Sequence, residues 1–172
     1  MAASERILNM SEVQTNLRVL TPSRRKLREG DVFAMLLPDE RYLFGRVILA
    51  DQPRERAPMP GANLIYIYRH RSSTKDPDRS ALHPDNLLLP PLYINRLPWS
   101  KGYFETIAHW PLVPGDVRSE HCFLSAGRGT YFNQNGEELP GPVEPVGDWG
   151  LHSYRTIDDE ISDALGFDRA PE

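Results

Sequence analysis

The chain has 172 residues, of which 40% are hydrophobic and 26% charged, as is typical of one soluble globular domain. No run approaches the roughly 20 apolar residues of a membrane helix, and the start lacks the pattern of a secretory signal, so we expect a cytoplasmic protein without a membrane partner. The single cysteine excludes an internal disulfide and a cysteine-cluster metal site, and the 16 prolines disfavour long helices.

The first part of the chain predicts an N-terminal extension over residues 1–27, followed by a single β-rich domain over residues 28–168. Within the extension, Val13, Leu17 and Leu20 have weak helical spacing. A short basic cluster follows at Arg24, Arg25, Lys26 and Arg28. Nucleic-acid binding usually requires a larger basic field with interleaved aromatic residues, so we do not expect nucleic acid as a partner.

The clearest pattern, residues 28–51, predicts a β-hairpin. Two strand-like runs, residues 31–37 and 41–49, are rich in aromatic and β-branched residues. Between them, Pro38-Asp39-Glu40 is typical of a turn, because proline presets φ and aspartate can bond its own backbone. Side chains alternate across a strand, so this hairpin should carry apolar residues on both faces.

Four residues of the hairpin are predicted to have structural roles. Gly30 is typical of a turn, and Asp31 can accept hydrogen bonds from the backbone there. Gly45 removes a side chain from one face, which indicates a bulge or a closely crossing strand. Arg46 projects from an otherwise apolar face and needs a partner. A buried Arg46–Asp31 pair would provide one.

Further strands are predicted at residues 62–69, 92–94 and 103–110, and residues 122–124 are expected to pair with 130–132. The strand at 62–69 should place Leu64, Tyr66 and Tyr68 on one face, and Ile65 and Ile67 on the other.

The best helix candidate lies near the end of the chain. Thr156 is the expected N-cap, Ile157, Ile161 and Leu165 form an apolar stripe, and Gly166 is the expected stop. We therefore predict a mainly β (α+β) fold: a bent antiparallel sheet or small open barrel of about six or seven strands, with one C-terminal helix packed on it.

Catalytic and metal-binding patterns are absent from the sequence. The five histidines form no local ligand pair, and a metal site would have to be assembled from distant segments. The neighbours His121 and Cys122 should point to opposite faces of a strand, so they would not form an ordinary dyad. The residues alone therefore predict neither a catalytic residue, nor a metal site, nor a cofactor.

The central stretch resembles the immunity protein 26 family of bacterial polymorphic toxin systems. The resemblance rests on Gly30-Asp31-Val32-Phe33-Ala34, Leu37-Pro38-Asp39, Tyr42, and Phe44-Gly45-Arg46-Val47. Weaker matches follow at residues 91–94, 102–104, 107, 111–112, 135–136 and 150–154. It implies an immunity protein that binds and neutralises a cognate toxin protein in the cytosol. The family name is also attached to a small phosphotriesterase. That alternative implies a hydrolase with an activated water or a metal, for which His109, His121 and Asp31 would be the candidates.

Charge is distributed unevenly along the chain. Residues 137–172 carry ten acidic and two basic residues, a net charge of −8. An acidic surface suits a toxin that acts on nucleic acid, because the active site of such a toxin tends to be basic. Acidic residues of the predicted helix, two of them expected in its first turn, and two aromatic anchors are therefore the predicted toxin-binding residues: Asp158, Asp159, Glu160, Asp163, Tyr154 and Trp149.

Overall fold

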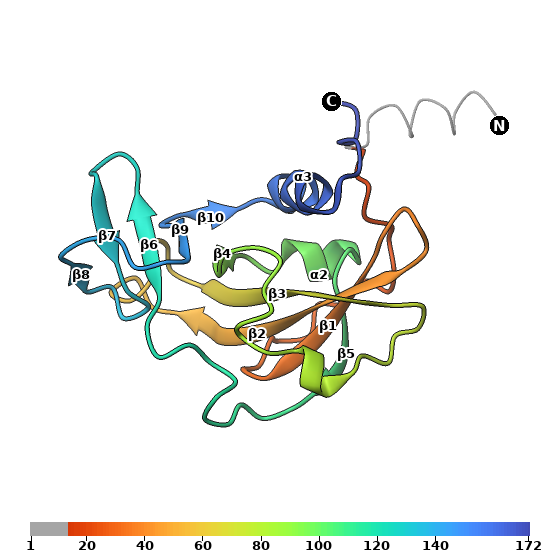
Figure 1. Ribbon diagram of the computed structural model, residues 1–172, viewed down its shortest axis with the longest axis horizontal. Coiled ribbons are helices and arrows are strands. Elements are labelled where there is room, and N and C mark those ends of the chain that lie inside the picture. The colour runs from red at the N-terminus through yellow and green to blue at the C-terminus, as the bar shows by residue number, and fades with distance from the viewer. Residues whose placement is uncertain (1–13) are drawn as a thin grey trace.

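A computed structural model describes residues 14–172, which form two β-sheets and one long helix (Figure 1). The larger sheet contains, in spatial order, β10 (Leu151–His152), β4 (Leu92–Ile94), β3 (Ala62–Ser72), β2 (Tyr42–Gln52), β1 (Asp31–Leu36) and β5 (Glu105–His109). The smaller sheet contains β8 (Glu138–Leu139), β7 (Thr130–Phe132), β6 (Cys122–Ser125) and β9 (Val146–Asp148). The helical elements are η1 (Arg79–Ala81), α2 (Leu97–Lys101) and α3 (Tyr154–Leu165).

The predicted mainly β class with a main C-terminal helix is confirmed. The described residues differ from the expected single sheet in having ten strands in two sheets. Most strand pairs are antiparallel, but β10 runs parallel to β4 and β9 runs parallel to β6. Both parallel strands come from the C-terminal part of the chain, which returns to join each sheet in turn.

The predicted hairpin is formed by β1 and β2, which pair antiparallel from Val32↔Arg46 to Leu36↔Tyr42. The predicted close approach at Gly45 is also confirmed. A Cβ atom at this position would overlap the ring of Phe33 on β1, and it would lie 2.7 Å from the carbonyl oxygen of Tyr66 on β3. The glycine is therefore required by packing between three neighbouring strands.

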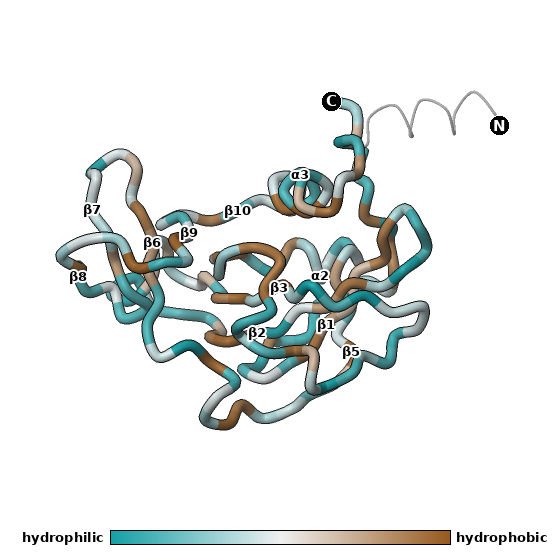
Figure 2. Tube along the Cα trace, in the orientation of Figure 1, coloured by the Kyte–Doolittle hydropathy of each residue, from teal (hydrophilic) through white to brown (hydrophobic). Residues whose placement is uncertain are grey.

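The larger sheet is buried on both faces, as its alternating side chains predict. One face, with Ile65 and Ile67, packs against α2 and against Ile157 and Ile161 of α3. The opposite face carries Leu64, Tyr66 and Tyr68 and packs against β6 and the segment that precedes it. Apolar stretches accordingly follow the strands in the middle of the molecule, and the surrounding loops are mostly hydrophilic (Figure 2).

Helix α3 begins earlier than the sequence predicts. Ser153 is the N-cap, and its hydroxyl accepts a hydrogen bond from the Thr156 N–H at 3.0 Å. The expected N-cap at Thr156 is therefore wrong, and Asp158 and Asp159 lie beyond the first turn. The predicted stop at Gly166 is confirmed, because this residue adopts a left-handed conformation with φ of 81°.

Residues 14–27 of the expected extension lie along the domain. Leu17 and Leu27 are buried in the core between the larger sheet and helices α2 and α3. Arg18 forms an isolated antiparallel β-bridge with Leu36 of β1. Residues 14–20 are not helical, so the weak helical spacing was misleading there. Val13 and the rest of residues 1–13 lie outside the described part of the chain. Among residues 14–172, no helix has the length and apolarity needed to cross a membrane.

Candidate functional site

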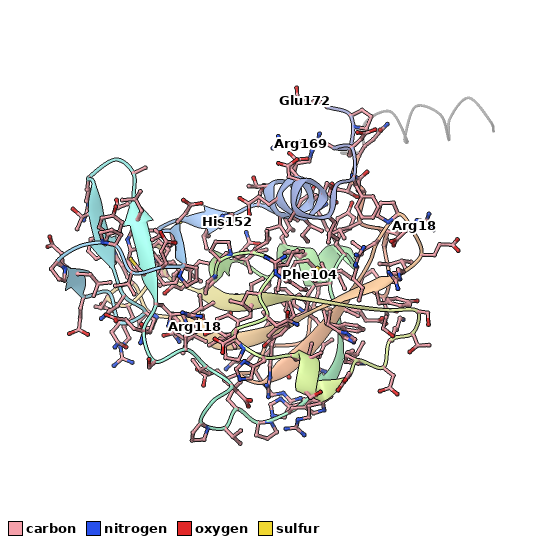
Figure 3. The ribbon with its side chains drawn as sticks, viewed as in Figure 1. Arg18, Phe104, Arg118, His152, Arg169 and Glu172 are labelled. Carbon is pink, nitrogen blue, oxygen red and sulfur yellow. The ribbon has the colours of Figure 1, made fainter. Side chains whose placement is uncertain are left out.

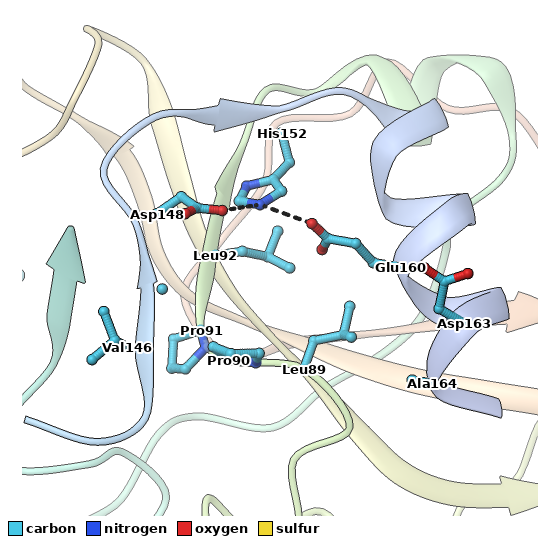
Figure 4. Close-up of a pocket in the computed structure, with 11 residues that line it drawn as sticks. Leu89, Pro90, Pro91, Leu92, Val146, Asp148, His152, Glu160, Asp163 and Ala164 are labelled. Carbon is cyan, nitrogen blue, oxygen red and sulfur yellow. Dashed lines mark ion pairs between the residues drawn. The ribbon is translucent and has the colours of Figure 1, made fainter. Parts of the chain in front are cut away.

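A groove lies where α3 meets the junction of the two sheets (Figure 4). It has a volume of about 440 Å³. The residues from Leu89 to Leu92 form one wall, the end of β9 forms a second, and α3 contributes Glu160, Asp163 and Ala164. The groove therefore combines an apolar floor with an acidic rim.

The chain crosses from the smaller sheet to the larger sheet at this groove. Gly147 of β9 packs against the carbonyl oxygen of Pro91, a position where a Cβ atom would overlap the backbone. This close approach brings the following Asp148 to the groove, and after two further residues the chain joins β4 as β10. His152 pairs with Ile94 in this short parallel ladder.

Asp148, His152 and Glu160 form a compact group at the rim. The Nε2 atom of His152 lies 3.3 Å from Oδ2 of Asp148 and 3.5 Å from Oε1 of Glu160 (Figure 4). His152 is 8% exposed, whereas Asp148 is largely exposed and Glu160 is half-buried. Burial opposes protonation of the imidazole, but the contact with the Glu160 carboxylate, the charges of Glu160 and Asp148 and a backbone contact with Tyr93 together outweigh burial and raise the pKa of His152 above its ordinary value.

In the structure, an arginine side chain lies against the predicted acidic face of α3 and offsets part of its negative charge. Arg169, which lies beside α3 near the C-terminus (Figure 3), donates from Nε to Oδ1 of Asp163 at 2.9 Å and also approaches Asp159 at 4.0 Å. This hydrogen bond lowers the pKa of the exposed Asp163. Asp159 is half-buried, so Asp163 is the most accessible of the predicted carboxylates on α3.

Asp158 does not belong to an exposed face, which corrects the prediction. It is 1% exposed, and its two oxygens accept hydrogen bonds from the backbone N–H groups of Asn16 at 2.9 Å and Leu17 at 2.7 Å. This carboxylate therefore fixes the N-terminal segment to α3. The sequence did not show this role, because the two donors lie more than 140 residues away.

The two predicted aromatic anchors differ in their surroundings. Tyr154, in the first turn of α3, stacks on Tyr103 with ring centroids 5.2 Å apart and remains half-buried. Trp149 contacts Phe132, with ring centroids 4.8 Å apart, and packs against the core beneath the smaller sheet. Both side chains have structural partners within the chain.

Comparison with known proteins supplies the family. The family model for immunity protein 26 matches residues 28–130, which is more than half of the chain. The chain belongs to the immunity protein 26 family. No curated protein and no solved structure gives a significant match.

The immunity protein 26 match covers both strands of the hairpin and extends to the beginning of β7. It therefore includes Asp31 and Arg46, whose partners differ from the expected Asp31–Arg46 pair. Arg46 bonds the carbonyl oxygen of Trp110 and lies 3.3 Å from Asp116. Asp31 instead contacts Arg28 at 3.3 Å and His109 at 2.9 Å. Asp31 and Arg46 are almost fully buried, at 3% and 2% exposure respectively.

The three residues named for a hydrolase do not form one site in the described structure. Asp31 and His109 face each other across β1 and β5. His121 lies instead beside Tyr66, with 2.6 Å between Nε2 and the phenolic oxygen. That oxygen also accepts a hydrogen bond from the Arg118 N–H, and a neutral His121 can share a hydrogen bond with it through Nε2. Burial lowers the pKa of His121 to about 4, consistent with this neutral form.

The basic cluster at the end of the extension lies at the surface. Arg24, Arg25 and Lys26 are exposed, and Arg28 contacts Asp31.

Sequence reasoning missed Asp148 and His152. Among residues 14–172, these two and Glu160 form the one group of at least three His, Cys, Asp or Glu side chains spaced to hold a metal ion. The signal in the sequence was weak, because the ligands come from two short strands and a helix. Their residue numbers, 148, 152 and 160, also lie beyond the family match at residues 28–130.

Proposed function

We propose that this chain is an immunity protein that binds a bacterial toxin domain in the cytoplasm and blocks the activity of that toxin. The observation that carries the proposal is membership of the immunity protein 26 family. The alternative hydrolase would need its candidate residues to act together. The separation of His121 from the Asp31–His109 contact favours the binding function over that alternative.

The acidic rim of the groove and the exposed side of α3 are the proposed contact surface. Asp163 is exposed and Glu160 is half-buried, and both line the groove. A toxin that cleaves or modifies nucleic acid presents cationic side chains around its active site, and these would be attracted to the carboxylates. Arg169 already contacts Asp159 and Asp163, so a cationic toxin residue would compete with it. Tyr154, at the start of α3, would provide an aromatic contact at the edge of this surface.

Charge changes on this surface test the proposal once a toxin domain that the chain protects against has been identified by co-expression. We expect Asp163→Lys to weaken binding at least tenfold. Arg169→Ala should accelerate association at low salt, because it removes the internal competitor. The matched control is Asp76→Lys, which makes the same charge change on an exposed loop after β3 and should leave affinity unchanged.

Three results would count against parts of this proposal. If the chain neither binds the toxin nor protects cells that express it, the immunity function is refuted. If binding is tight but insensitive to Asp163→Lys, the immunity function stands and the contact surface is wrong. Turnover of a chromogenic phosphotriester that a chelator abolishes, and that His109→Ala removes, would favour the hydrolase instead.

A further inference from the structure

The group formed by Asp148, His152 and Glu160 has features that neither family membership nor toxin binding explains. Its members come from three elements: Asp148 ends β9 in the smaller sheet, His152 ends β10 in the larger sheet, and Glu160 lies in α3. One nitrogen and two carboxylate oxygens, one atom from each residue, all lie within 4.8 Å of one another. They converge at the rim of the groove (Figure 4).

The distances within the group are long for direct bonds between an imidazolium and carboxylates. Charge-assisted N–H···O bonds are about 2.7–2.9 Å long. The Nε2 atom of His152 lies 3.3 Å from Asp148 and 3.5 Å from Glu160. The ring is more than nine-tenths buried, and its Nδ1 atom has no hydrogen-bond partner among the described residues. A nearly buried imidazole thus points Nε2 between two carboxylates and lies within ion-pair distance of both, but at more than the usual length of a charge-assisted hydrogen bond.

The same distances fit ligands that share a small cation. Zinc binds imidazole nitrogen and carboxylate oxygen at about 2.0–2.2 Å, so neighbouring ligand atoms in a tetrahedral site lie about 3.3–3.6 Å apart. The two nitrogen–oxygen distances in the group fall in this range. The third pair, the two carboxylate oxygens, lies within 4.8 Å, and because Asp148 is exposed its side chain has room to adjust around a cation.

We propose that Asp148, His152 and Glu160 bind a divalent transition-metal cation, with Zn²⁺ as the best match. A mixed nitrogen and oxygen donor set suits Zn²⁺, whereas Ca²⁺ requires six to eight oxygen ligands and Mg²⁺ requires six in an octahedral arrangement. The three side chains supply three ligands, so a water molecule would complete a tetrahedral shell. The bound cation ties the smaller sheet, the larger sheet and α3 together at one point.

The experiment titrates ZnCl₂ into the tag-free full chain after chelator treatment, with calorimetry and thermal unfolding as readouts. We expect one Zn²⁺ per chain, a higher Tm with the metal, and no comparable response to MgCl₂ or CaCl₂. Asp148→Asn and Glu160→Gln should each weaken Zn²⁺ binding at least tenfold and remove the Tm shift. Neither replaced side chain is fully buried, so both variants should fold.

The matched control is Asp163→Asn, which removes a carboxylate from the same groove without altering the three ligands. Its affinity for Zn²⁺ should equal that of the original chain. Co²⁺ provides a separate readout, because its binding should shift and broaden the imidazole NMR signals of His152 more strongly than those of any other histidine. The site is refuted if no stoichiometric binding occurs, if binding survives either Asp148→Asn or Glu160→Gln, or if Asp163→Asn weakens it equally.

Discussion

Replacement of Asp158 by alanine should destabilise the fold without acting through a toxin contact. The substitution removes both acceptors that hold the backbone N–H groups of Asn16 and Leu17. Because Asp158 is 1% exposed, this loss is a defect of the core rather than of the surface.

The magnitude follows from these two hydrogen bonds. Hydrogen bonds to charged groups contribute about 1.5–3 kcal/mol each, so the pair has an upper bound of about 6 kcal/mol. Burial raises the pKa of Asp158 even though both backbone bonds lower it, so desolvation of the carboxylate offsets part of this gain. The N-terminal segment that donates these two bonds is half-buried at Asn16, so its N–H groups can bond water instead when the segment detaches from α3. We therefore expect Asp158→Ala to cost about 3 kcal/mol of unfolding free energy.

Urea unfolding followed by tryptophan fluorescence measures this loss, with Asp158→Asn expected to be intermediate because one acceptor oxygen remains. Asp163→Ala is the matched control, since it removes the same group from an exposed position, where loss of the Arg169 contact should lower the midpoint far less than Asp158→Ala does. Toxin affinity of Asp158→Ala, measured where the variant is fully folded, should equal that of the original chain. A loss of unfolding free energy below about 1 kcal/mol, together with weakened toxin binding, would refute this reasoning and indicate that Asp158 contacts the toxin.

Three further predictions concern the fold. Burial lowers the pKa of His121 from 6.5 to about 4, so between these pH values the unfolded chain binds more protons than the folded chain. The free energy of unfolding should therefore fall by up to about 3 kcal/mol as the pH drops from 6.5 to 4. His121→Phe should make the urea midpoint less dependent on pH in this range, whereas His83→Asn should not. Gly45→Ala should lower Tm strongly or prevent soluble expression, because the new Cβ overlaps the facing phenylalanine ring, whereas Gly127→Ala meets no atom within 4 Å and should leave Tm unchanged. Ser153→Ala should cost about 1 kcal/mol in urea unfolding through loss of the α3 N-cap, and an unchanged midpoint would contradict that assignment.

Local patterns in the sequence predicted the central part of the fold well. Alternation within residues 62–69 assigned Tyr66 and Ile67 to opposite faces of the larger sheet, and each lies in the core cluster of its own face. The apolar stripe of Ile157 and Ile161 predicted which side of α3 packs on the sheet. These features depend on neighbouring residues, so a period of two or of about 3.6 residues reveals them.

Contacts between distant segments limited the remaining predictions. The partner of Arg46 is Asp116 in a loop after β5, rather than the nearby Asp31. Asp148 and His152 have a spacing of four, which would place them together on a helix, yet they lie on short strands of different sheets. Strands of two or three residues carry too little periodicity to be recognised, so the groove between the sheets was not predictable from the sequence.

The central claim is that this member of the immunity protein 26 family neutralises a toxin by binding it. The most direct measurement titrates the folded chain into an activity assay of its cognate toxin domain, while light scattering records the mass of the complex. The proposal predicts a defined complex and toxin activity that falls to background once one equivalent of the chain is present. Undiminished toxin activity at a large excess of folded chain, with no complex formed, would contradict it.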